Sequence, residues 1–133
     1  MKGYLLDTWA WFDYLEGGES AEKVNEILDS NENCYTSVQS MAELSDLYHQ
    51  GRLKIDMKWE TLRQFIAVKK TDSIQVTEEI AEEAGEIKAE ERKEKPNFGL
   101  ADAVILATAQ KHKLKLISGD PHLSSKEATR DIS

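Results

Sequence analysis

The sequence predicts an α/β fold, in which a parallel β-sheet carries helices on both of its faces. Short apolar runs alternate along the chain with longer segments in which apolar residues recur every three or four positions, the period of one helix face. This alternation is typical of α/β domains. Most of the short runs are separated by about 25 residues or more, which is long enough for a helical crossover between parallel strands. We therefore expect a doubly wound sheet with right-handed connections.

Five short runs are predicted to form strands, the last of them weakly. They are Gly3 to Leu6, Cys34 to Val38, Ser73 to Val76, Lys115 to Ser118 and Arg130 to Ile132. Helical periodicity occurs between them at Ala21 to Leu28, Met41 to Tyr48, Leu62 to Ile66 and Ile80 to Ile87. The segment Leu100 to Ala109 is apolar on nearly all sides and predicts a buried helix. The expected architecture is a sheet of four to five strands flanked by helices.

The length and composition indicate one domain that spans residues 1–133. With 40% hydrophobic residues, only 7 Gly and 2 Pro, the chain has the material for a sizeable core. The single cysteine, Cys34, excludes an intramolecular disulfide and a cysteine-based metal site, which fits the reducing cytoplasm. No run approaches the roughly 18 apolar residues of a membrane-spanning helix, so we expect no membrane association.

The charge of the chain is acidic overall and uneven along its length. A net charge of -8 argues against a protein that coats nucleic acid through bulk electrostatics. Residues 78–95 carry much of the acidic excess, whereas residues 52–70 contain six basic and two acidic side chains. The basic stretch is a candidate for contact with a nucleic-acid backbone, and a solvated surface is the alternative.

Two of the predicted strands are followed at once by an aspartate. Asp7 follows Leu5-Leu6, and Asp120 follows Ile117-Ser118-Gly119. In an open parallel sheet the ligand crevice lies beyond the carboxyl ends of the strands, so we expect both side chains to face one crevice. Aspartate is also a favourable helix N-cap, and a cap ahead of Thr8 or of Pro121 is the alternative for each.

Two further carboxylates are expected at the same edge, each near the start of a helix. Asp102 is the only charged residue of the apolar segment, and a buried carboxylate is costly unless it is paired or binds a metal. Contact with the helix dipole is its alternative role, which stabilises a helix by only about 0.3–1 kcal/mol. Glu43 opens the helix after the second strand, where Ser40-Met41-Ala42-Glu43 also matches a capping box.

Four carboxylates in one crevice require a positive partner. Two such charges about 4 Å apart repel by ~4 kcal/mol at an effective dielectric of 20, and burial adds to this effect, so at least one carboxyl pKa is expected to be raised. His49, His112 and His122 form no spaced metal pair and are expected on the surface, which leaves oxygen ligands. Such ligands suit Mg²⁺, with Mn²⁺ as a second possibility. A metal held this way activates water and binds a phosphodiester, as in metal-dependent nucleases.

At these motifs the chain resembles the PIN-domain family, and in size the VapC-type toxins of prokaryotic toxin–antitoxin pairs. The similarity runs from Leu5 to Asp120 and is carried, in order, by Leu5-Leu6-Asp7-Thr8, Met41-Ala42-Glu43-Leu44, Leu100 to Ala109 and Ile117-Ser118-Gly119-Asp120. The resemblance implies a dimeric Mg²⁺-dependent endoribonuclease that acts on RNA and is inhibited by a cognate antitoxin. It also implies a catalytic and metal-binding quartet with two supporting hydroxyls: Asp7, Glu43, Asp102 and Asp120, with Thr8 and Ser118.

One residue departs from the family pattern, and the function has alternatives. Trp9 stands where the family usually has a small or polar residue, and we expect it to narrow the pocket. A catalytically idle PIN-like scaffold that binds RNA or a protein is one alternative, and a housekeeping RNA-processing nuclease is another. A phosphoacceptor or phosphatase domain would need a second acidic residue beside Asp7 and a lysine at a later strand end, and the sequence has neither.

Overall fold

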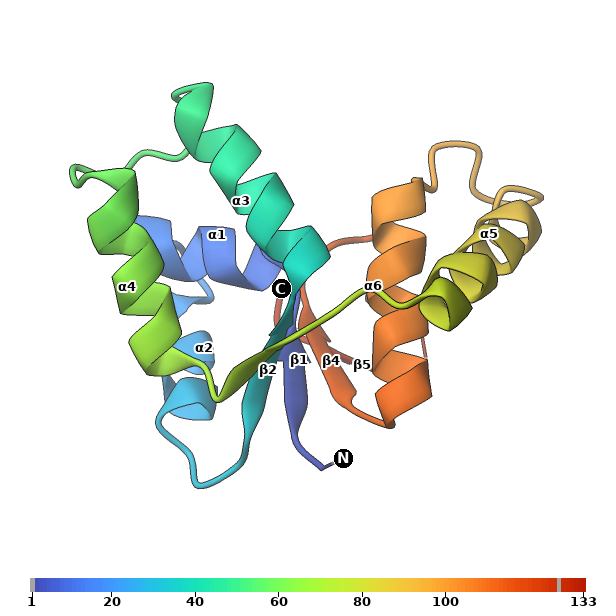
Figure 1. Cartoon of the computed structure of the whole chain (residues 1–133), viewed down its shortest axis with the longest axis horizontal. Helices are drawn as coiled ribbons and strands as arrows, with labels where there is room; N and C mark the ends of the chain where they lie inside the picture. The colour runs from blue at the N-terminus through green and yellow to red at the C-terminus, as the bar shows by residue number, and fades with distance from the viewer. Residues whose placement is uncertain (1, 127) are drawn as a thin grey trace.

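The computed structural model describes residues 2–126 and 128–133, and all of its paired strands are parallel. The strands form one five-stranded sheet: β1 (Tyr4–Leu6), β2 (Cys34–Ser37), β3 (Asp72–Ile74), β4 (Lys115–Ser118) and β5 (Thr129–Asp131). Their order across the sheet is β3-β2-β1-β4-β5 (Figure 1). The predicted parallel α/β sheet is therefore confirmed.

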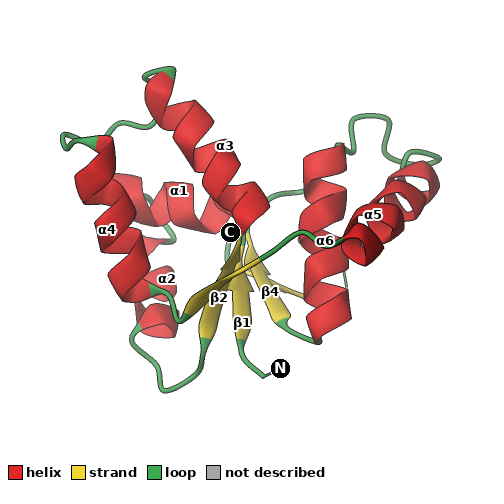
Figure 2. Cartoon of the chain, viewed as in Figure 1, coloured by secondary structure: helices red, strands yellow, loops and turns green. Residues whose placement is uncertain are grey.

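The helices cover the sheet in two groups, drawn in red around the yellow strands in Figure 2. One group contains α1 (Thr8–Glu16), α2 (Ala21–Leu28), α3 (Val38–His49) and α4 (Trp59–Lys69). The other contains α5 (Glu78–Glu91) and α6 (Leu100–His112), on the opposite side of the sheet (Figure 1). In the part of the chain that the structure describes, no helix is long and apolar enough to cross a membrane.

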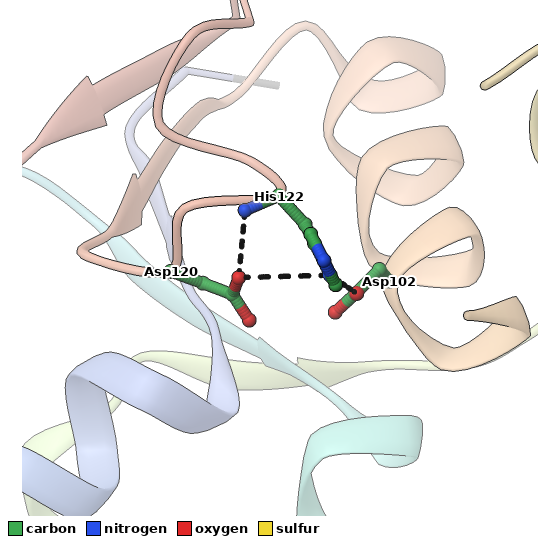
Figure 3. A group of neighbouring side chains, drawn as sticks. All are labelled: Asp102, Asp120 and His122. Carbon is green, nitrogen blue, oxygen red and sulfur yellow. Dashed lines mark hydrogen bonds and ion pairs between the residues drawn. The ribbon is translucent and has the colours of Figure 1, made fainter. Parts of the chain in front are cut away.

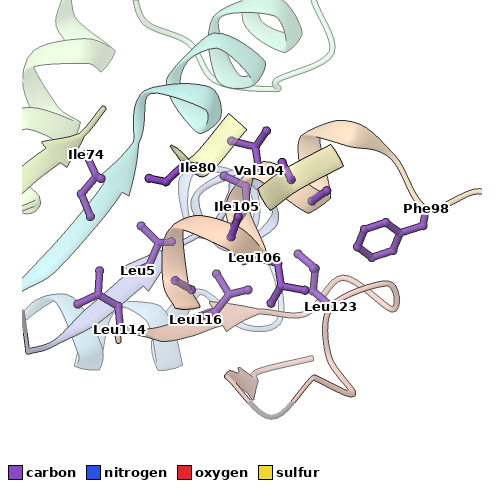
Figure 4. Close-up of a cluster of buried hydrophobic side chains, with 14 residues drawn as sticks. Leu5, Ile74, Ile80, Phe98, Val104, Ile105, Leu106, Leu114, Leu116 and Leu123 are labelled. Carbon is purple, nitrogen blue, oxygen red and sulfur yellow. The ribbon is translucent and has the colours of Figure 1, made fainter. Parts of the chain in front are cut away.

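The sheet separates two hydrophobic clusters, because successive residues of a strand point to opposite faces. Leu5 and Leu116 belong to the cluster under α5 and α6, which we call the α5–α6 cluster. Their neighbours Leu6 and Ile117 belong to the cluster under the other four helices, the α1–α4 cluster. Figure 4 shows the α5–α6 cluster, in which the buried side chains of α6 lie against the strands. These two clusters fix the helices to the sheet.

Strand boundaries differ from the sequence prediction by one or two residues, for reasons that lie in the neighbouring elements. Val38 begins α3 instead of ending β2, because the Ser37 side chain accepts the Gln39 N–H and caps the helix. β3 ends at Ile74, which pairs with the last residue of β2, so the predicted extension to Val76 has no partner strand. The weak fifth strand is present and has three residues.

The segment after Asp120 does not form the helix considered from the Asp120-Pro121 pair. Residues 121–126 form turns. The Asp120 carbonyl accepts two of their N–H groups, from Leu123 at 3.0 Å and from Ser124 at 2.9 Å. This compact turn replaces a helix and keeps the Asp120 side chain at the sheet edge.

The strand order places a topological reversal between β1 and β4. From β1 the chain extends through β2 and β3 in one direction, and later through β4 and β5 in the other. Ligands of open α/β sheets bind at the carboxyl edge beside such a reversal. Asp7 directly follows β1, and Asp120 follows β4 with one residue, Gly119, between them. The topology therefore brings the two aspartates to the expected binding position.

Candidate active site

A crevice of about 230 Å³ opens at the carboxyl edge of the sheet. The four carboxylates singled out from the sequence all line it, although they come from four different segments of the chain. The lining residues are Asp7, Thr8, Trp9, Phe12, Glu43, Leu47, Asp102, Ile105, Asp120 and Leu123. The crevice thus combines an acidic side with an apolar side.

Asp7 is both a helix cap and a member of the crevice. Its Oδ1 atom accepts the Ala10 N–H at 2.8 Å and caps α1, so the predicted capping role of Asp7 is confirmed. The side chain also forms a hydrogen bond with the Ser118 hydroxyl. The residue is only 3% exposed. Burial is the main cause that raises the pKa of Asp7 from 3.8 to about 7. These hydrogen bonds oppose the rise, and the charges of Asp120 and Asp102 add to it.

Glu43 faces the crevice and does not form the capping box that the sequence also allowed. α3 begins at Val38 and is capped by Ser37, which places Glu43 in the helix interior instead of its first turn. Its Oε1 atom accepts the Thr8 hydroxyl at 2.7 Å. Burial is the main cause of the raised pKa of Glu43, and the charges of Asp102 and Asp120 add to it.

Asp102 and Asp120 lie on the other side of the crevice. Asp102 stands in the first turn of α6, whose N-cap Gly99 has no side chain to cap the helix. Burial, followed by the charge of Asp120, raises the pKa of Asp102. Asp120 is held by the turn that contains it, since its N–H donates to the Ser118 hydroxyl at 3.0 Å.

His122 is the residue of this site that the sequence interpretation missed. Its Nδ1 atom lies 3.1 Å from Oδ2 of Asp102 and 4.0 Å from Oδ1 of Asp120. Figure 3 shows the imidazole ring between the two carboxylates. The expectation that the histidines lie on the surface and leave only oxygen ligands did not anticipate this contact of His122 with Asp102. The available signal was its position, two residues after Asp120 in the same post-strand turn.

The apolar side of the crevice is built around Trp9. Its ring lies against the backbone of Gly119, where an added Cβ atom would come within 2.4 Å of the ring. Glycine is therefore required at this position for the Trp9 ring to lie there. Trp9 also lines the crevice beside Phe12 and Leu47.

The residues present fit a divalent cation. Three carboxyl groups have raised pKa values, and none of the described residues that line the crevice is a lysine or arginine that would offset their charge. Ligand atoms of Asp102, Asp120 and His122 all lie within 4.8 Å of one another. Carboxylate oxygens are suitable ligands for Mg²⁺ and Mn²⁺, and imidazole is a common ligand of transition metals.

The parallel sheet and the carboxylates at its carboxyl edge together define a class of α/β domain with an acidic, metal-compatible crevice. Within that class the chain belongs to the PIN-domain family, because the family model described as PIN domain matches residues 4–128. This match confirms the resemblance noted in the four sequence motifs.

Solved structures with the same fold include toxins in complex with antitoxins. A toxin–antitoxin complex from Klebsiella pneumoniae has a TM-score of 0.75 at 21% identity, over 98% of each chain. DNA-bound VapBC from Salmonella typhimurium has a TM-score of 0.72 at 16% identity, over 100% of each chain. VapC20 of Mycobacterium tuberculosis, a sarcin–ricin loop cleaving toxin, has a TM-score of 0.66 at 17% identity, over 88% of each chain. Comparison with curated protein sequences gives no match.

Proposed function

We propose that this protein is a metal-dependent endoribonuclease that hydrolyses RNA phosphodiester bonds, and that it is the toxin of a type II toxin–antitoxin pair. The observation that carries the proposal is the crevice, in which four carboxylates meet without a basic lining residue among those described. Family membership supports a nuclease. A neighbour named as a sarcin–ricin loop cleaving toxin supports RNA as the substrate.

The four carboxylates have distinct roles in this proposal. Asp7 and Asp102 would hold the cation, while Glu43 and Asp120 would complete the ligand set or position the attacking water. A bound Mg²⁺ or Mn²⁺ supplies Lewis acidity toward the phosphate and lowers the pKa of water. The hydroxyls of Thr8 and Ser118 keep the Glu43 and Asp7 carboxylates in place through the hydrogen bonds described above.

The proposed partners are a cognate antitoxin and a second copy of this chain. Neighbouring structures that are named as toxin–antitoxin complexes support the first partner. The basic stretch at residues 52–70 stays a candidate for contact with the RNA backbone, and none of the described lining residues comes from it. A strictly monomeric mass in solution at micromolar concentration would contradict the homodimer.

Cleavage of single-stranded RNA tests the activity. The protein is incubated with RNA and Mg²⁺ or Mn²⁺, and EDTA is added in a parallel reaction. We expect cleavage with either cation, none with EDTA, and none for Asp7→Asn although its circular dichroism spectrum remains that of a folded protein. Asp56→Asn makes the same chemical change at an exposed position and should cleave normally.

Two results would contradict the nuclease. Cleavage that persists in EDTA, or in the Asp7→Asn variant, would show that another group or a contaminant performs the reaction. No cleavage with any divalent cation would favour the idle scaffold that binds RNA or protein.

A further inference from the structure

The His122 side chain lies beside Asp102 and Asp120 at the edge of the crevice, where hydrogen bonds of its backbone and a contact of its ring hold it. Its N–H donates to Oδ1 of Asp120 at 2.8 Å, and its carbonyl accepts the Lys95 ammonium at 3.2 Å. The ring packs against the buried Phe98 ring, with 6.0 Å between the centroids. A surface histidine needs none of these restraints, whereas a histidine that serves a site is usually oriented by them.

The supporting contacts continue into α5 and the segment after it. Glu91 forms ion pairs with Lys95, at 3.8 Å, and with Lys126 of the turn that carries His122. Lys95 also lies 3.5 Å from the Ser125 hydroxyl of the same turn. The turn is therefore tied to α5 through both of these lysines, and the position of the imidazole is set before any ligand arrives.

We propose that Nδ1 of His122 is a direct ligand of the cation in this crevice, and that it makes the site favour transition-metal cations such as Mn²⁺ and Co²⁺ over Mg²⁺. This inference rests on the proposed metal-dependent function and goes beyond it, because it adds a nitrogen to a ligand set otherwise composed of oxygens. It assigns His122 a selectivity role.

The geometry supports direct ligation. The Nδ1 atom points to Asp102 at 3.1 Å and to Asp120 at 4.0 Å, as Figure 3 shows. Metal bonds of about 2.0–2.2 Å place two ligand atoms of one ion roughly 3 to 4.4 Å apart, which covers both separations. Both carboxylates beside the imidazole belong to the quartet that is proposed to bind the metal or position its water.

The chemistry of the ligands then gives the selectivity. Mg²⁺ is small and hard, and it prefers carboxylate and water oxygens to nitrogen. For a site with nitrogen and oxygen ligands, affinity among first-row divalent metals increases from Mn²⁺ towards Co²⁺ and Ni²⁺. One imidazole nitrogen in this crevice therefore strengthens the binding of Co²⁺ most and that of Mg²⁺ least.

Calorimetric titration of the full-length protein with Mg²⁺, Mn²⁺ or Co²⁺ tests the proposal. His122→Ala removes the ligand, and His122→Asn replaces nitrogen with an oxygen-bearing side chain. We expect either variant to lose at least tenfold in Co²⁺ affinity and less than threefold in Mg²⁺ affinity. His112→Asn, in the last turn of α6, is the matched control and should keep the wild-type ratio of affinities.

Pulsed electron paramagnetic resonance of bound Mn²⁺ gives a second readout, since a coordinated imidazole nitrogen couples to the metal. We expect a nitrogen signal in the wild-type protein and in His112→Asn, and none in His122→Ala. An equal loss of affinity for all three cations, without a nitrogen signal, would mean that His122 only orients Asp102 and would overturn the proposal.

The same titrations separate this inference from the proposed function. Wild-type protein that binds these cations and cleaves RNA, with a ratio of affinities that His122→Ala leaves unchanged, would refute the role of His122 alone. Wild-type protein that binds none of the three cations would refute both.

Discussion

The substitution Asp7→Asn should stabilise the metal-free protein at alkaline pH. The pKa of Asp7 is raised from 3.8 to about 7, chiefly by burial. The folded state then binds the proton more tightly than the unfolded state, so this contribution to stability is complete below pH 3.8 and is lost as the pH rises through about 7. A rise of about 3 in pKa corresponds to about 4 kcal/mol.

Asparagine removes the charge, and its amide oxygen can still accept the Ala10 N–H. We expect the free energy of unfolding of Asp7→Asn at pH 8 to exceed that of the wild type by about 2 kcal/mol, half of the value above. Relaxation and water penetration reduce the penalty for an ionised group beside an open crevice. For a chain of this size, a gain of about 2 kcal/mol is a rise of roughly 5–8 °C in melting temperature. At pH 4 both side chains are neutral in the folded state, and the two proteins should differ little.

Urea denaturation in EDTA at pH 4 and pH 8 measures this effect. Asp56→Asn is the matched control, since its side chain is exposed and the substitution should leave stability unchanged at both pH values. If Asp7→Asn were less stable than the wild type at pH 8, or gained the same amount at pH 4, then an ionised Asp7 would not be the source of the cost, and the reasoning from burial would be refuted.

Three further perturbations test other parts of the site. In thermal shift measurements, Asp102→Asn should also melt at a higher temperature than the wild type in EDTA at pH 7, and added Mn²⁺ should stabilise the variant less than the wild type. A lower melting temperature of the variant in EDTA would indicate a purely structural carboxylate. Gly119→Ala should cost about 1–3 kcal/mol in urea denaturation, because the new methyl group would lie 2.4 Å from the Trp9 ring. In a Trp9→Ala background, where the clash is absent, the same substitution should cost much less. Thr8→Val removes the hydrogen bond that lowers the pKa of Glu43, so the pKa of Glu43 should rise. The acidic limb of the pH profile of RNA cleavage should then move to higher pH. An unmoved profile would exclude Glu43 as the titrating group.

The fold was predictable because its signals are local in the sequence. Each strand is a short apolar run, and the apolar composition of the segment from Leu100 onward predicts a buried helix. The boundaries were less predictable because they depend on the neighbouring elements. β3 stops where β2 offers no further partner, and the start of α3 is set by Ser37 in competition with Ser40.

The carboxylates of the site were predictable for a different reason. Asp7 and Asp120 follow strands, and the rule for the carboxyl edge of a parallel sheet applies to them without any knowledge of side-chain packing. His122 was not predictable in this way, since its contact with Asp102 spans 20 residues and depends on the turn at residues 121–126. Pro121 instead suggested a helix, which would have directed the following side chains elsewhere.

The crevice joins two separately packed halves of the molecule. Asp7 and Glu43 belong to elements packed on the α1–α4 cluster, whereas Asp102 and the His122 turn belong with the α5–α6 cluster. Strands of three or four residues run between the halves, so the distances between the carboxylates of the two halves depend on how each core fills its side of the sheet. Close packing transmits changes in side-chain volume. Substitutions at buried residues distant from the crevice, such as Leu62 in one core and Ile80 in the other, are therefore expected to change the distances between the carboxylates that line it.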